Sequence, residues 1–578
     1  MLRLILGRSS SGKSTYVRNI IAEKAEKGEE IILVVPEQFS FESERIIIEM
    51  LGAKKAAEVS ILSFTSLSKK ILDEYMPDRK PPVTNAAKDV LMSLTLEALS
   101  EKLSVFGKCA KSRVTVSEIL HITDELIQYD VSPAQLINAA EKSGNRILIQ
   151  KSKEIELISS LYSAMLEERF SDDRYMINAA TETIRDKKLF KGKTVVFDEF
   201  SGFTAQQMLL LDVLFTQAEN VYITMCADSV KDLSMGTGAL SYPAENIRKL
   251  IQLAKMRSVS VAEPVILSND GRYDSPAIAI LEKGIYEPNP DIYENDASEI
   301  TLATAKNIYD ECDFAAMTAK KLVREKGYRY RDIVIVSRGN DYARHLPFAL
   351  KKYDIPVFED TRHSLETEII VIYTLSALTI AAEGFSTDTM LRYLKTYLTG
   401  ISEDDIMLLE NYVLMWHIDY SAWLNDWTGH PDGMGNEFDS DATERLSLIN
   451  EIRRRAVMPL ITLKKNMTDA DALSCTKAVF EFLKNTKADE NLLTFALGLD
   501  NDNAYSCERS WDELMNVLSL FAETVGERNI TPVRYLELFS IMVASSDMGD
   551  IPSGLDEITI GDADRIRVAD KKVLFIVG

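Results

Sequence analysis

Residues 1–14 read Met-Leu-Arg-Leu-Ile-Leu-Gly-Arg-Ser-Ser-Ser-Gly-Lys-Ser, an apolar run followed by a loop rich in serine and glycine. The loop fits the pattern G-x-x-x-x-G-K-[ST], in which backbone N–H groups of a tight turn surround phosphate oxygens. An amphipathic stretch, residues 15–27, follows the loop, so the N-terminus of a helix would face the same anion. The start of the chain therefore predicts a strand, a phosphate-binding loop and a helix. The alternative is a solvated turn that binds nothing.

The ligand that this loop predicts is ATP with Mg²⁺. Lys13 would reach the β- and γ-phosphates, and the hydroxyl of Ser14 would ligate the metal ion. The other positions of the loop would surround the phosphates: Gly7, Arg8, Ser9, Ser10, Ser11 and Gly12.

The next segments continue the alternation of short apolar runs with amphipathic stretches, which is typical of a parallel sheet in an α/β fold. We expect a first α/β domain from residues 1–81 and 191–267, interrupted at 82–190 by a helical insertion. After a linker at about 268–298, a second α/β domain is expected from residues 299–365 and 555–578. A second helical insertion would fill 366–554. The strands expected in the second domain are residues 300–303, 333–337, 357–359, 557–560 and 573–577.

A pair of acids follows the apolar run Thr194–Phe197. Asp198 would hold Mg²⁺, directly or through water, and Glu199 could orient the attacking water as a general base. Many surface strands also end in acidic residues, so the pair alone is a weak signal. Together with the loop at residues 7–14, it predicts a site for a nucleoside triphosphate.

Composition narrows the class of protein. The 578 residues carry 66 Lys+Arg and 89 Asp+Glu, a net charge of 66 − 89 = −23, with 46% hydrophobic residues. This is an ordinary globular composition, and it argues against a uniformly basic nucleic-acid-binding domain but not against a local basic channel. The five cysteines are far apart, which indicates a reducing, cytoplasmic compartment. No apolar run is long enough to cross a membrane.

Several segments resemble superfamily 1 DNA helicases, and in particular the AddB family of bacterial helicase-nuclease subunits. The resemblance covers the chain in order and corresponds to the N-terminal half of a longer family. It implies two RecA-like units of the P-loop NTPase type, each with a helical insertion. Besides the loop, the residues that carry it are 35–41, 61–64, 197–204 with Gln206 and Gln207, and 558–565.

The family implies further site residues. Gln38, Phe39 and Phe64 follow the second and third strands, at an edge that faces single-stranded DNA in related helicases. Phenylalanine can stack on bases, although each of the two could instead belong to the core. Arg338 matches a position from which helicases direct an arginine towards the γ-phosphate, and an exposed ion pair is the alternative.

The chain also departs from active helicases. Phe200 and Ser201 stand where motors usually carry Gln-Asp, and Ala227-Asp228-Ser229 where they carry Gly-Asp and then Gln. Residues 560–565 lack the expected Thr, Lys-Gly and Glu. The nucleotide-binding residues thus remain, while those that couple hydrolysis to DNA movement are altered, as in the family's DNA-scanning, Chi-recognising subunit.

The resemblance implies a heterodimer with an AddA-like helicase-nuclease subunit that processes DNA double-strand breaks for recombinational repair. The family's nuclease residues and the four cysteines of its [4Fe–4S] cluster are not evident in this chain. Two other functions stay open. The chain could be an active superfamily 1 helicase, which would displace strands without a partner. It could also be a P-loop ATPase unrelated to DNA, which would show no salt-dependent binding to single strands.

Overall fold

The computed structural model places the chain in two compact units. It describes residues 1–9, 11–110, 112–129, 131–172, 175–227, 240–267, 275–285, 290–338, 340–359, 362–498, 501–549, 556–563, 566 and 571–578; within these, the side chains of 53, 340, 343, 358–359, 362–363, 501–506 and 547–549 are left undescribed. The first unit comprises residues 1–81, 122–145 and 171–306, and the second comprises 82–121, 146–170 and 307–578.

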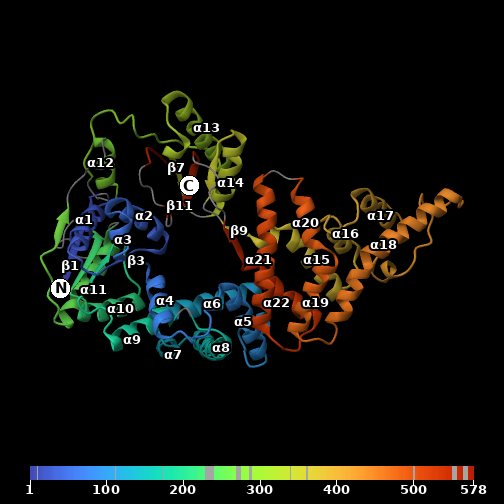
Figure 1. Cartoon of the computed structure of the whole chain (residues 1–578), viewed down its shortest axis with the longest axis horizontal. Coiled ribbons are helices and arrows are strands. Elements are labelled where there is room, and N and C mark those ends of the chain that lie inside the picture. Colours follow the sequence, from blue (N-terminus) through green and yellow to red (C-terminus); the bar gives the residue numbers. More distant parts are fainter. Residues whose placement is uncertain are drawn as a thin grey trace. The chain divides into compact units, whose positions relative to one another are not determined.

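The first unit is built on a six-stranded sheet in the order β3-β2-β4-β5-β1-β6, in which every pair of neighbours is parallel. Parallel pairing requires a crossover between strands, and helices supply it here (Figure 1). The strands are β1 (Leu2–Gly7), β2 (Ile31–Val34), β3 (Val59–Leu62), β4 (Thr194–Phe197), β5 (Asn220–Cys226) and β6 (Val265–Leu267). The helices are α1 (Lys13–Glu26), α2 (Ser40–Leu51), α3 (Ala53–Ala56), α4 (Phe64–Tyr75), α7 (Pro133–Ser143), α9 (Met176–Lys187), α10 (Ala205–Gln217), α11 (Ser241–Met256) and α12 (Pro276–Gly284).

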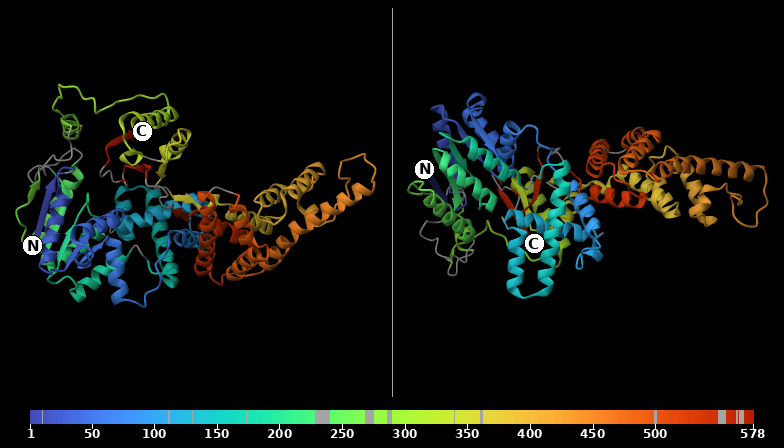
Figure 2. Two further views of the ribbon diagram at one scale, coloured as in Figure 1. Left: turned by 45° about the horizontal axis from the view of Figure 1, so that its top comes forward. Right: turned by 90° about the horizontal axis from the view of Figure 1, so that it is seen from below.

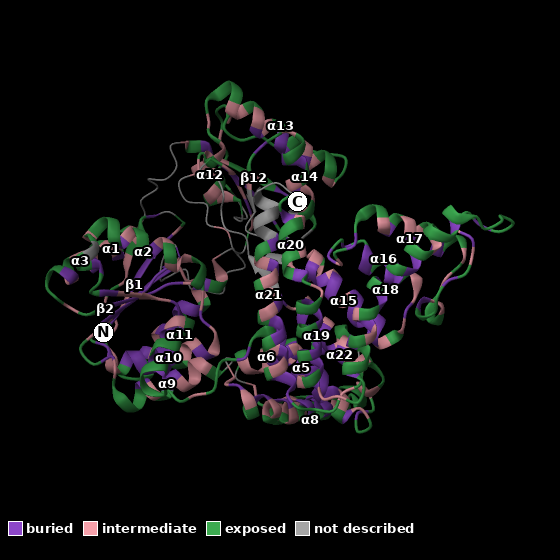
Figure 3. Ribbon diagram, turned by 45° about the vertical axis from the view of Figure 1, so that its right-hand side comes forward, coloured by how far each residue is buried: buried purple, intermediate pink, exposed green. Residues whose placement is uncertain are grey.

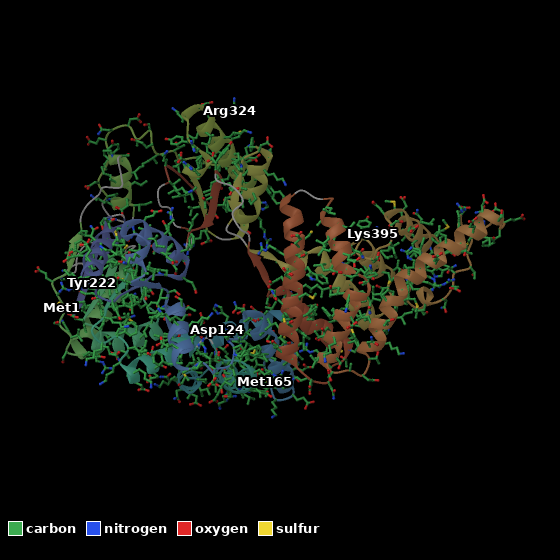
Figure 4. All side chains as sticks on the ribbon, in the orientation of Figure 1. Met1, Asp124, Met165, Tyr222, Arg324 and Lys395 are labelled. Carbon is green, nitrogen blue, oxygen red and sulfur yellow. The ribbon has the colours of Figure 1, made fainter. Side chains whose placement is uncertain are left out.

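Helices cover both faces of this sheet, because its central strands are apolar on both sides. Leu2, Leu4 and Leu6 of β1 pack against one cluster, which includes residues of α4, α10 and α11. Ile5 packs with α1 and α2 on the other face. Figure 3 shows the strands buried and the helices exposed on their outer sides. Tyr222 of β5, labelled in Figure 4, lies under the guanidinium of Arg3 at 5.6 Å.

The second unit contains a smaller parallel sheet in the order β12-β7-β11-β8. Its strands are β7 (Ile333–Ser337), β8 (Val357–Glu359), β11 (Ile558–Asp562) and β12 (Val573–Val577), and it packs on α13 (Ile308–Lys326) and α14 (Asn340–Lys352). Two short strands, β9 (Arg362–Ser364) and β10 (Asp547–Gly549), pair antiparallel. The strand β11 returns to β7 after the long helical segment, so residues far apart in sequence share one sheet (Figure 2).

The rest of the second unit is helical and has one large apolar core. In this core, α15 packs against α16, α18, α21 and α22. The helices α5 and α8 belong to the same unit, as does most of α6 (Arg113–Gln128). The remaining bounds are α5 (Asn85–Leu99), α8 (Arg146–Arg169), α15 (Ile369–Glu383), α16 (Thr387–Leu394), α17 (Glu403–Met415), α18 (Ser440–Met467), α19 (Ala472–Asn485), α20 (Ala488–Ala496), α21 (Asn501–Val525) and α22 (Pro532–Ala544).

The structure confirms an α/β fold with two parallel sheets. The strand expected at residues 300–303 is wrong: this segment forms no strand, and Leu302 is 96% exposed. Its alternating apolar side chains have no neighbouring strand to pair with in the structure, and alternation alone does not make a strand. In the described parts of the chain, no helix combines the length and apolarity needed to cross a bilayer.

Candidate functional site

The predicted site residues of the first unit lie at one edge of the six-stranded sheet. In a parallel sheet all strands end at the same edge, where open α/β sheets bind ligands. The loop at residues 7–14 follows β1, Asp198 follows β4, and Gln38 and Phe39 follow β2 in a short 3₁₀ turn, Glu37–Phe39. The fold therefore places these three segments on the same side of the sheet.

Two glycines permit the sharp turn of the loop. A Cβ atom on Gly7 would lie 2.2 Å from Ser11 Oγ and 2.7 Å from the backbone oxygen of Leu267, so no larger residue fits. Gly12 adopts a left-handed conformation with φ of +88° immediately before α1, a conformation that other residues rarely adopt. The pattern G-x-x-x-x-G thus has a steric basis at its first glycine and a conformational one at its second.

The side chains of the loop converge on its centre. Lys13 Nζ donates hydrogen bonds to the backbone oxygens of Gly7 at 2.9 Å and Arg8 at 2.7 Å. Ser11 is 5% exposed, and its hydroxyl has no hydrogen-bond partner in the described structure. Ser14 is half-buried in the first turn of α1, and Ser9 is exposed. Ser10 lies outside the described residues.

Asp198 is buried and firmly held. It is 4% exposed, and its Oδ1 accepts hydrogen bonds from Thr224 Oγ1 at 2.6 Å and from the backbone N–H of Glu199 at 3.0 Å. Thr224 lies on β5, which separates β4 from β1. The threonine hydroxyl also accepts from the Glu199 N–H at 3.2 Å, so both residues fix the Asp198 carboxylate at the sheet edge.

Glu199 is turned towards the helix that follows the loop. Its backbone has φ of +69°, an uncommon value for a residue other than glycine that is found at constrained sites. Its Oε1 lies 4.0 Å from Nη2 of Arg18 on α1, and both side chains are largely buried. Arg18 stands one helical turn after Ser14, so the acidic pair and α1 meet.

The segment after β2 exposes a different phenylalanine from the one predicted. Gln38 is exposed and Phe39 is half-buried, whereas Phe41, in the first turn of α2, is 81% exposed. An apolar side chain exposed to this extent at a sheet edge is available for stacking.

The prediction that Phe64 stacks on bases is wrong. Phe64 is 4% exposed and packs in an aromatic cluster, with its ring centroid 5.6 Å from Phe197, 5.4 Å from Phe200 and 6.2 Å from Phe203. The N-cap Ser63 turns the chain so that Phe64 begins α4 and points into the core. The same cluster explains Phe200, which fills apolar space where helicase motors carry a polar residue.

The remaining predicted residue, Arg338, belongs to the second unit. It directly follows β7 and is exposed. Residues 228, 229, 564 and 565 of the altered motifs lie outside the described residues.

Sequence reasoning missed Thr224, Arg18 and Phe41. Thr224 is 2% exposed, and as the polar residue within the apolar run of residues 221–226 it carried a signal. Arg18 could have been found from its position four residues after Ser14, which places both on one face of α1.

Comparisons with known proteins agree with this assignment of segments. The family model described as "ADDB, N-terminal" matches residues 4–282. The chain is 28% identical to the B-type subunit of an ATP-dependent helicase/deoxyribonuclease from Caldanaerobacter subterraneus subsp. tengcongensis, covering 100% of this chain and 51% of the relative. Identity to the protein of the same name from Clostridioides difficile is 30%, with the same coverage. A Clostridium botulinum relative, also of this name, is 28% identical, with 52% of its length covered. The chain thus spans about half the length of these relatives.

Proposed function

We propose that this chain, which belongs to the AddB family, binds ATP·Mg²⁺ and single-stranded DNA in its first unit, as half of one subunit of a helicase-nuclease that processes DNA breaks. The observation that carries the proposal is the placement of the loop at residues 7–14, Asp198 and the segment after β2 at one sheet edge. On this proposal the six-stranded unit is RecA-like, and the smaller sheet is part of a second such unit, with the predicted domain boundaries.

The residues present fit a bound triphosphate. The buried hydroxyl of Ser11 lacks a partner, and Lys13 Nζ bonds to uncharged carbonyl oxygens that phosphate oxygens could replace. Ser14 and Asp198 would hold Mg²⁺, whose bound charge would stabilise the transferring phosphoryl group. Glu199, oriented by Arg18, would position the attacking water, and Arg338 of the second unit would sense the γ-phosphate.

Replacing Asp198 by asparagine tests this metal site. We expect ATP to bind the wild type about tenfold more tightly with Mg²⁺ than with EDTA, and Asp198→Asn to lose that difference, because asparagine lacks the charge that a cation needs. Asp73→Asn, an exposed acid on α4, is the matched control. Isothermal titration calorimetry measures both. Mg²⁺ dependence that survives in Asp198→Asn would contradict the assignment.

Single-stranded DNA would cross the same sheet edge and contact Gln38, Phe39 and Phe41. Phe41 stands out among these because of its exposure, and base stacking on an aromatic ring is sequence-tolerant. Phe64 has no part in this surface, because it is buried.

Phe41→Ala should weaken binding to a mixed-sequence single strand about fivefold, since one stacking contact is lost. The slope of log K on log salt concentration should stay unchanged, because no charge is removed. Ile48→Ala, an exposed apolar residue on the same helix, serves as the control and should bind like the wild type. Fluorescence anisotropy over a salt series measures this, and equal affinity of both variants would remove Phe41 from the DNA surface.

The altered motor positions support a scanning role rather than a motor role. Phe200 is packed with Phe64 and Phe203, so it cannot act as the polar residue that motors use at this position. We infer weak ATP hydrolysis by this chain, recognition of a Chi-like sequence and pairing with an AddA-like subunit. Vigorous DNA-stimulated turnover that Lys13→Ala abolishes would instead favour an active helicase.

The cysteines of this chain are not arranged to hold an iron–sulfur cluster. They are free and far apart: Cys312, Cys475 and Cys507 are buried, Cys226 is half-buried, and Cys109 is exposed. Across the described residues, no group of three or more His, Cys, Asp or Glu side chains is placed to hold a metal. On this proposal the cluster and the nuclease residues belong to the other half of the family's length.

A further inference from the structure

Arg8, the second residue of the phosphate loop, directs its side chain onto α12. Its Nε lies 3.2 and 3.1 Å from the two carboxylate oxygens of Glu282, and its Nη2 donates to the backbone oxygen of Glu282 at 2.9 Å. Each of the two side chains is 25% exposed. One residue of α12 therefore holds the guanidinium through both its carboxylate and its main chain.

The helix α12 depends on this contact. Ala277 is its buried residue, whereas Leu281 is 44% exposed. Glu282 stands in the last turn, where the helix dipole disfavours a carboxylate and backbone oxygens lack partners within the helix. The guanidinium of Arg8 compensates for both, because it neutralises the carboxylate and satisfies one of those oxygens.

The other end of Arg8 belongs to the phosphate site. Its backbone oxygen accepts a hydrogen bond from Lys13 Nζ at 2.7 Å, so phosphates bound by Lys13 would lie close to Arg8. A triphosphate would attract the guanidinium and repel the carboxylate of Glu282. Both effects oppose the pair between Arg8 and Glu282.

We propose that Glu282 competes with the nucleotide phosphates for Arg8, so that nucleotide binding releases α12 from the loop. The inference rests on the proposed nucleotide site and adds a link between that site and a helix outside it. Because such coupling is reciprocal, a change that releases α12 raises nucleotide affinity by the same factor. Arg8 is thus a positioning residue for α12 and Glu282 its competitor for phosphate.

The first test is nucleotide affinity of the full chain, measured calorimetrically with a non-hydrolysable ATP analogue and Mg²⁺. Glu282→Gln should bind about three- to tenfold more tightly than the wild type, since the competing charge is gone. Glu245→Gln is the matched control: it makes the same change of charge in the same unit, at an acid that pairs with Lys249. It should bind like the wild type.

The second test is hydrogen exchange of the amides of residues 276–284. In the wild type, the analogue should accelerate their exchange. In Arg8→Ala, exchange should be fast without nucleotide and should not change when it is added. A wild type that binds the analogue while α12 exchanges unchanged or more slowly, together with equal affinities of wild type and Glu282→Gln, would overturn the proposal. A wild type that binds no nucleotide would instead overturn the proposed function.

Discussion

Replacing Lys13 by alanine should weaken binding of ATP·Mg²⁺ about 100-fold. The ammonium group is held over the loop by the backbone oxygens of Gly7 and Arg8, so it is already in place to meet phosphate oxygens. A hydrogen bond between charged groups contributes up to about 3 kcal/mol, which corresponds to a loss of that size in affinity. Isothermal titration calorimetry with a non-hydrolysable analogue measures it without interference from turnover.

The control for this experiment is on the same helix. Lys24 lies near the end of α1 and pairs with Glu29, so Lys24→Ala removes an equal charge away from the loop and should leave affinity unchanged. Hydrogen exchange of residues 7–14 distinguishes a lost phosphate contact from a collapsed loop, because Lys13 also bonds to the loop itself. A Lys13→Ala variant that binds within twofold of the wild type would contradict the phosphate site.

The order of elements in the first unit could be predicted because each depends on local pattern. The apolar run at residues 2–6, the glycines of the loop and the amphipathic stretch behind it specify β1, the turn and α1 without information from the rest of the chain. Parallel pairing then brings the strand ends to one edge. Asp198 could be placed there from its position after a buried strand.

The side-chain surroundings of the site could not be predicted in the same way. The hydrogen bond from Thr224 to Asp198 depends on β5 lying between β4 and β1, and strand order is not encoded in any local pattern. Phe64 follows a strand as Phe39 does, yet it points into the core because Ser63 caps α4. Glu282 lies far from Arg8 in sequence, so only the folded chain shows the pair.

The second large effect concerns the stability of the second unit, at Glu154 of α8. The carboxylate accepts hydrogen bonds from the backbone N–H groups of Ser104, Val105 and Phe106, from the Ser104 hydroxyl and from the Gln150 amide, at 2.7–3.1 Å. Burial by itself would raise the pKa of Glu154, but these hydrogen bonds lower it to about 2 from the ordinary 4.5. They favour the charged form because every donor points at the carboxylate.

Glu154→Gln should lower the free energy of unfolding of this unit by about 3 kcal/mol near pH 7, because a glutamine amide cannot accept all of these bonds. All four tryptophans of the chain lie in the second unit, at residues 416, 423, 427 and 511. Tryptophan fluorescence during urea denaturation therefore follows this unit alone. Glu156→Gln, at an exposed position of the same helix, is the control and should change stability little.

The pH dependence separates the charge of Glu154 from its packing. A carboxylate whose pKa is lower in the folded state than in the unfolded state stabilises the fold fully above the unfolded value, and this contribution disappears as pH falls through the folded value. The difference in stability between wild type and Glu154→Gln should therefore be constant above about pH 5 and shrink progressively between pH 4.5 and 2. A difference that stays constant over that range would show that the loss arises from packing and not from the charged hydrogen bonds.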